Sequence, residues 1–465
     1  MLKPIDSISR DMGRLHDIAI VGGGLSAASV VYALLQRVMT TPAKKLSPLR
    51  ITVFEKTENL WTGVPYGQLA NKDYFLIETV EETNCPLFTR WLIDNKKEIA
   101  SYALFSTPVV EEWYQKNREK IEAGDIDNLY FPRRVFGLFV GRLLKNIIAR
   151  ASRLGLLKME HIRQEVADVQ YQSKEGFRIV TCPEIAACSD MTFCYPSVVL
   201  AIGSIPKSMP FHIPCTLIDD IDYISDSEIC AHLDLSNRLT RVFSSKTIRK
   251  LDVVIIGSAA SAIETIFLIG TNQNYLDRIG RVTVVSTSGF LVGGIRAKNY
   301  QENDLPDYVL LRKSSDIYVS TAHKLCQQDI LKVVKARVIN IQKNNGRYAI
   351  TLDGKVERVT LQTDLLINCT GSGTVDNTTS GLINNLKIKL PINKERRGFN
   401  VDDQNMVHRF PGLFLVGPLL NRSFSGKQVE SISAVFREGD IVADALFRDL
   451  SRSVEEKANE AMSSI

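Results

Sequence analysis

The sequence lacks the residue patterns that metal and dithiol centres require. Its eight cysteines are scattered along 465 residues, and no two of them form a Cys-x-x-Cys pair. The six histidines are isolated from one another and show no metal-ligand spacing. We therefore expect no metal site, and the cysteine usage is typical of free thiols in a reducing cytoplasm.

Long hydrophobic runs and a strong charge of one sign are also missing. No stretch approaches about 18 uninterrupted apolar residues, so no membrane span is predicted. Asp6, Asp11 and Arg14 precede the first predicted strand, where a secretory signal would need an apolar segment. A net charge of +5 is small for this length and predicts neither a nucleic-acid-binding nor a membrane-binding surface. These absences predict a cytoplasmic protein without nucleic-acid or membrane partners.

The amino-acid composition is that of a globular protein. Its hydrophobic content of 45% and charged content of 23% are typical of a soluble protein with a sizeable core. A length of 465 residues suits two or three domains. The composition leaves the oligomeric state open.

A glycine-rich turn follows the first predicted strand, residues 18–21. Gly22 suits the tight turn, Gly24 lets backbone N–H groups approach a pyrophosphate, and Ala27 permits close helix–strand packing. The N-terminus of the following helix then faces the negative charge of the diphosphate. This pattern predicts a dinucleotide site, and a Rossmann-like unit without a ligand is the alternative.

The next predicted strand, residues 51–54, ends in Glu55. A carboxylate at this position holds the ribose hydroxyls of an adenine dinucleotide. Glu55 lies further from Gly24 than the usual spacing of about 20 residues. The polar, proline-bearing run 40–48 accounts for the excess as a loop inserted after the helix.

A second unit of the same kind covers residues 252–268, with Gly257, Ser258 and Ser261 at its turn. Ala259 replaces the glycine that lets backbone approach the pyrophosphate, which is a departure from the pattern. The following strand, 281–285, ends in the hydroxyls of 286–288, with Arg296 and Lys298 downstream. Hydroxyls and cations in place of a carboxylate suit a 2′-phosphate, so NADPH is favoured over NADH.

Each unit is followed by meander-like strands and then by a strand that ends in a glycine turn. In the first unit these lie at 166–180 and 197–203, and in the second at 336–350 and 364–371. A helical segment lies between, with helices predicted over 86–100, over 109–125 and from Gly137 onward. A last strand at 412–418 precedes a helix at about 429–447. This duplication predicts an α/β fold of two Rossmann-type, three-layer ββα dinucleotide-binding domains, the second inserted in the first.

The predicted boundaries follow from this order. We expect a first dinucleotide-binding domain at 1–245 with a helical insertion at about 80–155, an NAD(P)-binding domain at 246–365, the C-terminal part of the first domain at 366–450 and a frayed polar tail at 451–465.

The order of motifs resembles flavoproteins that bind FAD and NAD(P)H on two Rossmann units, a family that includes FAD-dependent N-hydroxylating and Baeyer–Villiger-type monooxygenases. Residues 201–204 and 369–371 resemble the two hinge motifs of that family, with Ile202 departing in the first. Residues 63–67 and 131–137 resemble two motifs of a bacterial FAD/NAD(P)-binding subfamily, some members of which are similar to amino-acid N-hydroxylases.

The resemblance implies FAD as the cofactor of the first domain, so that 1–245 and 366–450 form the FAD-binding domain, NADPH as the cofactor of the second domain, and a small-molecule substrate. Glu430 would lie at the start of the last helix, facing the flavin, although simple compensation of the helix dipole explains it as well. The resemblance also implies the following cofactor-binding residues: Gly22, Gly24, Leu25, Ser26, Ala27, Glu55, Lys56, Tyr66, Arg134, Val166, Ala201, Gly203, Gly257, Ser258, Ser261, Thr287, Arg296, Gly371, Gly417 and Pro418. Arg134 is expected to contact an anion and Tyr66 to stack near the flavin. The alternatives are a salt-bridged surface arginine and an ordinary core aromatic.

The implied activity is that of an FAD-dependent, NAD(P)H-oxidising monooxygenase acting on a small polar substrate, with an amine or amino acid as the candidate. No catalytic residue is assigned, because the flavin supplies the chemistry. Two alternatives stay open: an FAD-dependent reductase without oxygen insertion, and a non-catalytic flavin-binding scaffold or sensor. A glutathione-reductase type of centre is disfavoured, because Cys85 is the only cysteine before Cys182.

Overall fold

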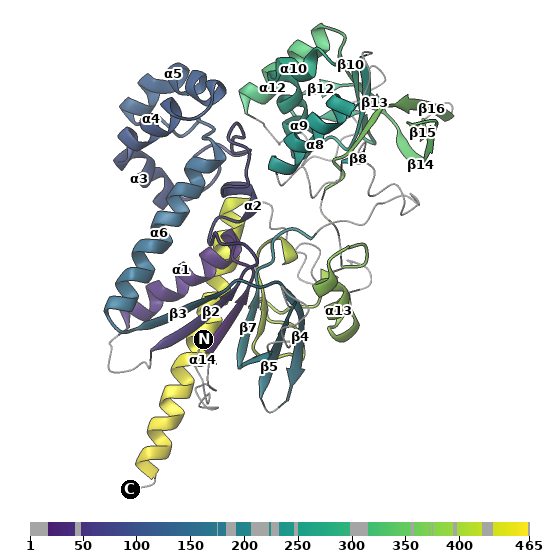
Figure 1. Ribbon diagram of the computed structural model, residues 1–465. Helices are drawn as coiled ribbons and strands as arrows, with labels where there is room; N and C mark the ends of the chain where they lie inside the picture. The colour runs from purple at the N-terminus through teal and green to yellow at the C-terminus, as the bar shows by residue number, and fades with distance from the viewer. Residues whose placement is uncertain are drawn as a thin grey trace, which may run out of the picture.

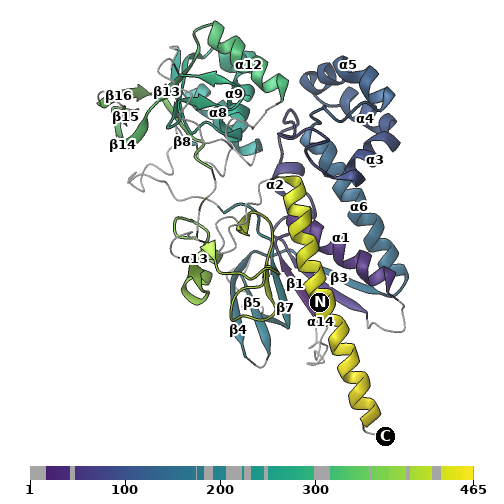
Figure 2. The same ribbon diagram turned by 180° about the vertical axis from the view of Figure 1, so that it is seen from behind.

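The computed structural model describes residues 17–41, 48–173, 175–182, 192–205, 223–224, 232–245, 250–297, 315–354, 358–371, 373, 375–393, 398–420 and 431–463. These residues form two parallel β-sheets, each accompanied by a three-stranded antiparallel sheet and by helices. The predicted fold class is confirmed. Figures 1 and 2 show the two units one above the other, with the helical insertion beside them.

The first parallel sheet has the strand order β20-β7-β1-β2-β3. Its strands are β1 (Asp17–Val21), β2 (Leu49–Phe54), β3 (Leu157–Ile162), β7 (Ser197–Leu200) and β20 (Leu413–Leu415). The central strand β1 is buried from Ile18 to Val21, as expected of a continuous apolar strand covered on both faces. Because β20 follows the second unit in the chain and completes the first sheet, the second unit is inserted in the first.

Both faces of this sheet are covered. On one face lies an antiparallel sheet of β4 (Val166–Gln172), β5 (Gly176–Thr181) and β6 (Thr192–Tyr195). The rings of Phe193 and Tyr195 meet Phe54 edge-on there, with centroids 5.4 and 6.0 Å away. On the other face, α1 (Leu25–Thr40) packs against α6 (Arg133–Arg153) and α14 (Ile432–Ser463) (Figure 1).

A helical insertion separates β2 from β3 and consists of α2 (Gly63–Tyr66), α3 (Pro86–Asp94), α4 (Lys96–Leu104), α5 (Pro108–Ala123) and α6. The helix predicted over 86–100 is divided, because Asn95 leaves the helical conformation with φ −118° and ψ 30°. The helix predicted over 109–125 is α5, which ends where Gly124 turns left-handed with φ +82°.

The second parallel sheet has the order β13-β10-β9-β17-β8. Its strands are β8 (Tyr223–Ile224), β9 (Leu251–Ile256), β10 (Ile279–Ser286), β13 (Leu331–Lys335) and β17 (Leu365–Asn368). Its helices are α8 (His232–Ser245), α9 (Ala260–Thr271), α10 (Gln273–Leu276) and α12 (Asp316–Gln327). Two smaller antiparallel sheets complete the second unit. One consists of β14 (Arg337–Asn344), β15 (Arg347–Asp353) and β16 (Arg358–Thr363), and the other is the hairpin of β11 (Phe290–Leu291) and β12 (Ile295–Arg296).

After β17 the chain returns to the first unit through α13 (Gly381–Lys389), the strands β18 (Ile392–Asn393) and β19 (Gly398–Phe399), β20, and the short helix η4 (Gly417–Leu420). The long helix α14 then crosses α1, where Arg37 pairs with Asp440 at 2.9 Å. The far end of α14 projects beyond the sheet in both views (Figures 1 and 2).

The structure differs from the expected boundaries at three places. β8 and α8, expected in the first domain, belong to the second unit: β8 pairs with β17, and Arg278 beyond α10 donates to the carbonyl of Phe243 in α8 at 2.6 Å. β17 likewise extends the second unit beyond residue 365. The expected tail is helical as far as Ser463, as part of α14.

Gly137 does not open α6, because Pro132 already caps the helix and it starts at Arg133. Gly137 lies one turn later, against the carbonyl oxygen of Tyr66, where a side chain would not fit. The glycine therefore allows the close approach of α2 to α6 rather than marking a helix start.

Candidate cofactor and active site

The first glycine turn has the geometry of a phosphate cradle. Gly22 has φ +95°, and a Cβ on it would lie 2.5 Å from the carbonyl oxygen of Ala201, so only glycine fits. Its N–H donates to the carbonyl of Phe54 at 2.8 Å, which fixes the turn from β1 into α1 against the end of β2. Gly24 precedes α1 without a side-chain cap, and no acidic residue stands in the first turn of the helix. The first-turn amides therefore meet no acceptor from their own cap, which suits an anion.

Glu55 lies beside this turn at the end of β2. One carboxylate oxygen accepts the N–H of Gly23 at 2.9 Å, and the other accepts the N–H of Thr57 at 2.9 Å. These bonds fix the orientation of the carboxylate, while each oxygen keeps a lone pair for a ribose hydroxyl. Trp61 covers the turn: its N–H donates to the carbonyl of Gly23 at 2.5 Å, from a φ of 80° that is rare for an aromatic residue.

The other parallel strands bring further predicted residues to the same edge. Ala201 follows β7 and donates to the carbonyl of Val21 at 2.8 Å, and Gly203, with φ +74°, borders open space. Gly417 and Pro418 follow β20, and Gly417 lies directly against the hydroxyl of Ser26 in α1. Because the strand order reverses between β1 and β7, this edge is a topological switch point, where open α/β sheets bind ligands.

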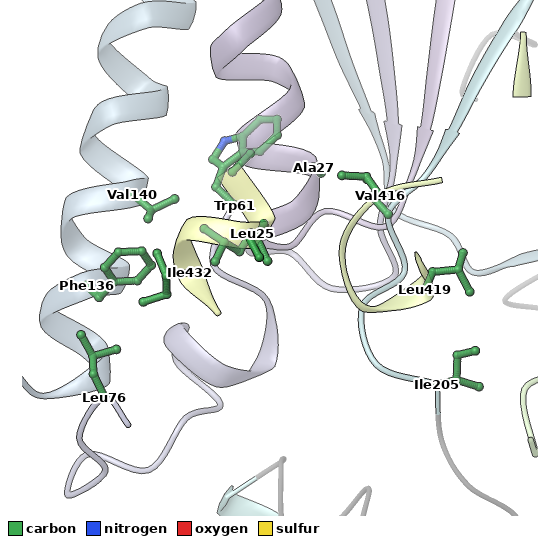
Figure 3. Close-up of a cluster of buried hydrophobic side chains, with 14 of the residues drawn as sticks. Leu25, Ala27, Trp61, Leu76, Phe136, Val140, Ile205, Val416, Leu419 and Ile432 are labelled. Atoms are coloured by element: carbon green, nitrogen blue, oxygen red, sulfur yellow. The ribbon is translucent and has the colours of Figure 1, made fainter. Parts of the chain in front are cut away.

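The remaining α1 residues of the prediction support the cradle from behind. Leu25 and Ala27 are buried in the first turn of α1. Figure 3 shows them with Trp61, Phe136 and Ile432 in the buried hydrophobic cluster around the start of α14. This cluster keeps water from the region between α1, α6 and α14.

Arg134 and Tyr66 have local partners. The Arg134 guanidinium donates to the carbonyl oxygens of Gln68 and Ala70 at 2.6–3.1 Å, and so holds the loop that leaves α2. The Tyr66 ring packs edge-on against Phe136 at 5.0 Å, and burial raises the pKa of its phenol to about 12. The phenol is therefore neutral at physiological pH. The predicted anion contact of Arg134 and flavin stacking of Tyr66 stay predictions.

Two further predicted residues flank the end of β2. Lys56 is exposed, 3.9 Å from Glu165, in a surface pair that contributes little. Val166 is buried at the start of β4.

The second glycine turn repeats the first. Gly257 has φ +105°, donates its N–H to the carbonyl of Val285 at 3.0 Å, and lies against the carbonyl of Cys369. Ala259 precedes α9 with φ −88° and ψ −159°, close to the −84° and −162° of Gly24. This conformation is extended and open to any residue, so Ala259 leaves the turn intact. α9, whose first turn includes Ser261, also begins without a side-chain cap or an acidic residue in that turn. Gly371, with φ +82°, follows β17 at the same edge.

The tips of β10 and β13 carry hydroxyls and cations. Ser286 is hydrogen-bonded to Ser258 at 3.0 Å and to Ser288 at 2.9 Å. Thr287 follows Ser286 directly and is exposed. Arg296 is also exposed and lies near this strand end, because it pairs with Phe290 in the hairpin that follows. Sequence reasoning missed Lys335, which lies opposite Ser286 at the end of β13, although a cation at the end of a parallel strand is a visible clue. Lys298 and Glu430 lie outside the described residues.

A buried ion pair that sequence reasoning also missed joins the two units. Arg133, at the start of α6, pairs with Glu264 of α9. Burial raises the pKa of the Glu264 carboxyl, and the Arg133 guanidinium opposes this rise. The clue was a lone carboxylate in the otherwise uncharged sequence of α9.

The described residues show no sign of a metal site, a disulfide centre or a membrane span. Among these residues no three His, Cys, Asp or Glu side chains are grouped to hold a metal. The cysteines of the described part, Cys85, Cys182, Cys194, Cys326 and Cys369, are free thiols. None of the helices found there has the length and hydrophobicity needed to span a bilayer.

Residues 19–204 match a family model described as FAD-NAD(P)-binding. An uncharacterized protein of Mycobacterium tuberculosis is 27% identical over 286 residues, which are 59% of this chain and 52% of that protein. A protein of Mycobacterium bovis matches to the same extent. The chain thus spans about half the length of the curated relatives it matches.

Solved structures of similar fold cover nearly the whole chain. The ornithine N-hydroxylase of Kutzneria sp. 744 has a TM-score of 0.58 at 17% identity, covering 94% of this chain and 99% of that one. The L-lysine 6-monooxygenase of Pseudomonas syringae has a TM-score of 0.58 at 16% identity, covering 94% and 100%. At such identities the likeness is one of fold. The chain therefore matches an FAD-NAD(P)-binding family over residues 19–204 and shares its overall fold with these solved proteins.

Proposed function

We propose that this protein is an FAD-dependent, NADPH-oxidising monooxygenase that hydroxylates a small polar substrate, an amine or amino acid. The observation that carries the proposal is a glycine turn that occurs twice, with a carboxylate at the neighbouring strand end in the first copy and hydroxyls and cations there in the second. Glu55 stands beside the first, and Ser286 with Arg296 and Lys335 stands near the second. The match of residues 19–204 to an FAD/NAD(P)-binding family supports FAD on the first unit. The amine substrate is supported by the named activities of the solved proteins that share the fold.

When bound, FAD supplies the hydride acceptance and the oxygen chemistry. The residues of this chain would bind, orient and exclude water. The first-turn amides of α1 would hold the diphosphate, and Glu55 the ribose. Arg296 and the β10 hydroxyls would hold a 2′-phosphate on the second unit. The buried cluster of Leu25, Trp61, Phe136 and Ile432 would keep the region near α14 dry (Figure 3).

Anaerobic mixing with NADPH tests this proposal. Protein loaded with FAD should lose its visible flavin absorbance with NADPH and much more slowly with NADH. Dithionite provides the control, because it reduces flavin without a nicotinamide site. A flavin that dithionite bleaches and NADPH does not would identify a non-catalytic scaffold.

Admitting air then separates the two enzyme classes. Oxygen uptake should yield hydroxylated product from one member of a panel containing ornithine, lysine and a simple diamine. Reoxidation that gives only hydrogen peroxide across the panel, with rapid electron transfer to an artificial acceptor, would contradict the monooxygenase assignment and favour the reductase.

A further inference from the structure

We propose that Arg133, Glu264 and Tyr318 form an interdomain clamp that positions the second Rossmann unit for hydride transfer to the first. The clamp consists of these three side chains and the backbone of Phe75. The positioning role of the clamp rests on the proposed function. The contact that it makes between the two units does not depend on that function.

The ion pair of the clamp joins residues 131 positions apart in the sequence. The Arg133 and Glu264 side chains are only 16% and 6% exposed. Arg133 is held by the insertion before it reaches Glu264: its Nε donates to the carbonyl of Phe75 at 3.1 Å, and its guanidinium lies 5.6 Å from the centre of the Tyr74 ring. Its backbone N–H also donates to the carbonyl of Tyr74 at 2.8 Å. The guanidinium therefore presents one fixed direction to α9.

Tyr318 provides the second contact between the units. This residue of α12 is fully buried, and its hydroxyl accepts the N–H of Phe75 at 2.6 Å and donates to the carbonyl of Phe75 at 3.3 Å. Its ring packs against Phe267 of α9 at 4.7 Å. Two helices of the second unit, α9 and α12, thus hold the same short segment of the insertion.

The clamp connects the start of α9, at the second glycine turn, with the start of α14, which lies in the same buried cluster as Leu25 at the start of α1. Glu264 lies on α9, five positions after Ala259 at the second glycine turn. Phe75 lies three positions before Glu78, whose carboxylate accepts the N–H of Ile432 at the start of α14 at 3.2 Å. A shift of α9 against the insertion would therefore change the distance between the two sites. Misplacement of reacting groups by about 1 Å costs on the order of 100-fold in rate.

A buried ion pair is weak evidence for stability, because desolvation offsets most of the attraction, but it does specify an orientation. The pair Arg142–Glu98 makes a useful contrast. It joins α6 to α4, so both partners belong to the insertion, and its side chains are 49% and 27% exposed. Removing it leaves the clamp intact.

Three single variants test the clamp: Glu264→Gln, Tyr318→Phe and the control Glu98→Gln. At saturating NADPH, flavin reduction should slow by about 10-fold to 100-fold in the first two and stay unchanged in the control. FAD content and reduction by dithionite should be unchanged in all three. Loss of FAD together with unchanged reduction of the remaining flavin would mean a merely structural role and would overturn the positioning role. Tyr318→Phe removes a single hydroxyl, so it remains informative if Glu264→Gln fails to fold.

Calorimetry of the same variants tests the contact independently of the activity. Wild-type protein and Glu98→Gln should unfold in one transition, and the clamp variants in two, as the units separate. A single transition in Tyr318→Phe with wild-type reduction by NADPH would overturn the clamp. If wild-type flavin is not reduced by NADPH, the proposed function fails, and the calorimetry still tests whether the clamp joins the units.

Discussion

The two Rossmann units share one turn and differ in what stands beside it. Gly22 and Gly257 both have a positive φ, and Gly24 and Ala259 have nearly the same dihedral angles. At the tip of the neighbouring strand, however, the first unit has a carboxylate and the second has hydroxyls. Under the proposed function, the turn serves a dinucleotide in both units, and the tip of the next strand selects which dinucleotide binds.

The largest expected effect comes from Gly22→Val compared with Gly257→Val. A valine at either position adopts a left-handed φ, which costs about 1–3 kcal/mol, and collides with a backbone carbonyl. Gly22→Val should give colourless protein, and Gly257→Val yellow protein that dithionite bleaches and NADPH does not. Circular dichroism checks that both fold. Flavin retained by Gly22→Val would contradict the placement of FAD on the first unit.

A smaller effect is expected from Glu55→Gln. Both carboxylate oxygens accept backbone N–H groups, and the amide of glutamine would turn one acceptor into a donor facing a donor. FAD affinity should fall by roughly 10-fold to 100-fold, equivalent to about 1–3 kcal/mol, measured by titrating flavin fluorescence. NADPH affinity should not change. Equal losses for both cofactors would show that Glu55 supports the fold rather than one site.

Arg296→Glu should change the choice of nicotinamide cofactor. Reversing this charge near the β10 hydroxyls should raise the KM for NADPH by about tenfold and leave that for NADH nearly unchanged. Arg358→Glu, an exposed arginine on β16 of the same unit, is the matched control. A similar rise in the control would reveal a general effect of net charge.

The smallest effect is expected from Ala259→Gly. Since alanine already adopts the dihedral angles of Gly24, restoring the glycine should change the KM for NADPH by no more than about twofold. A large improvement would mean that the methyl group blocks the pyrophosphate.

The glycine turns and buried strands were predictable because local backbone conformation and burial determine which residue types occur there. Gly22 and Gly257 need a positive φ, and an apolar run such as 251–256 suits a strand covered on both faces. Side-chain partners between distant segments were not predictable in this way. Of two adjacent arginines, Arg134 binds backbone nearby and Arg133 reaches the other unit, and only the helical phase of α6 decides between them.

The domain boundaries were less predictable for a similar reason. β8 has two residues, and its place in the second sheet depends on pairing with β17, more than 140 positions away. Periodicity carries no information on such a partner. The polar sequence after Leu450 predicts a tail, but it also contains good helix formers, and α14 continues through it to Ser463.

The most direct test of the two-site account is a sequential calorimetric titration of one sample, first with FAD and then with NADP⁺. The account predicts one FAD and one NADP⁺ bound per chain, with FAD retained when NADP⁺ is added. Failure to bind FAD, or displacement of FAD by NADP⁺, would contradict it.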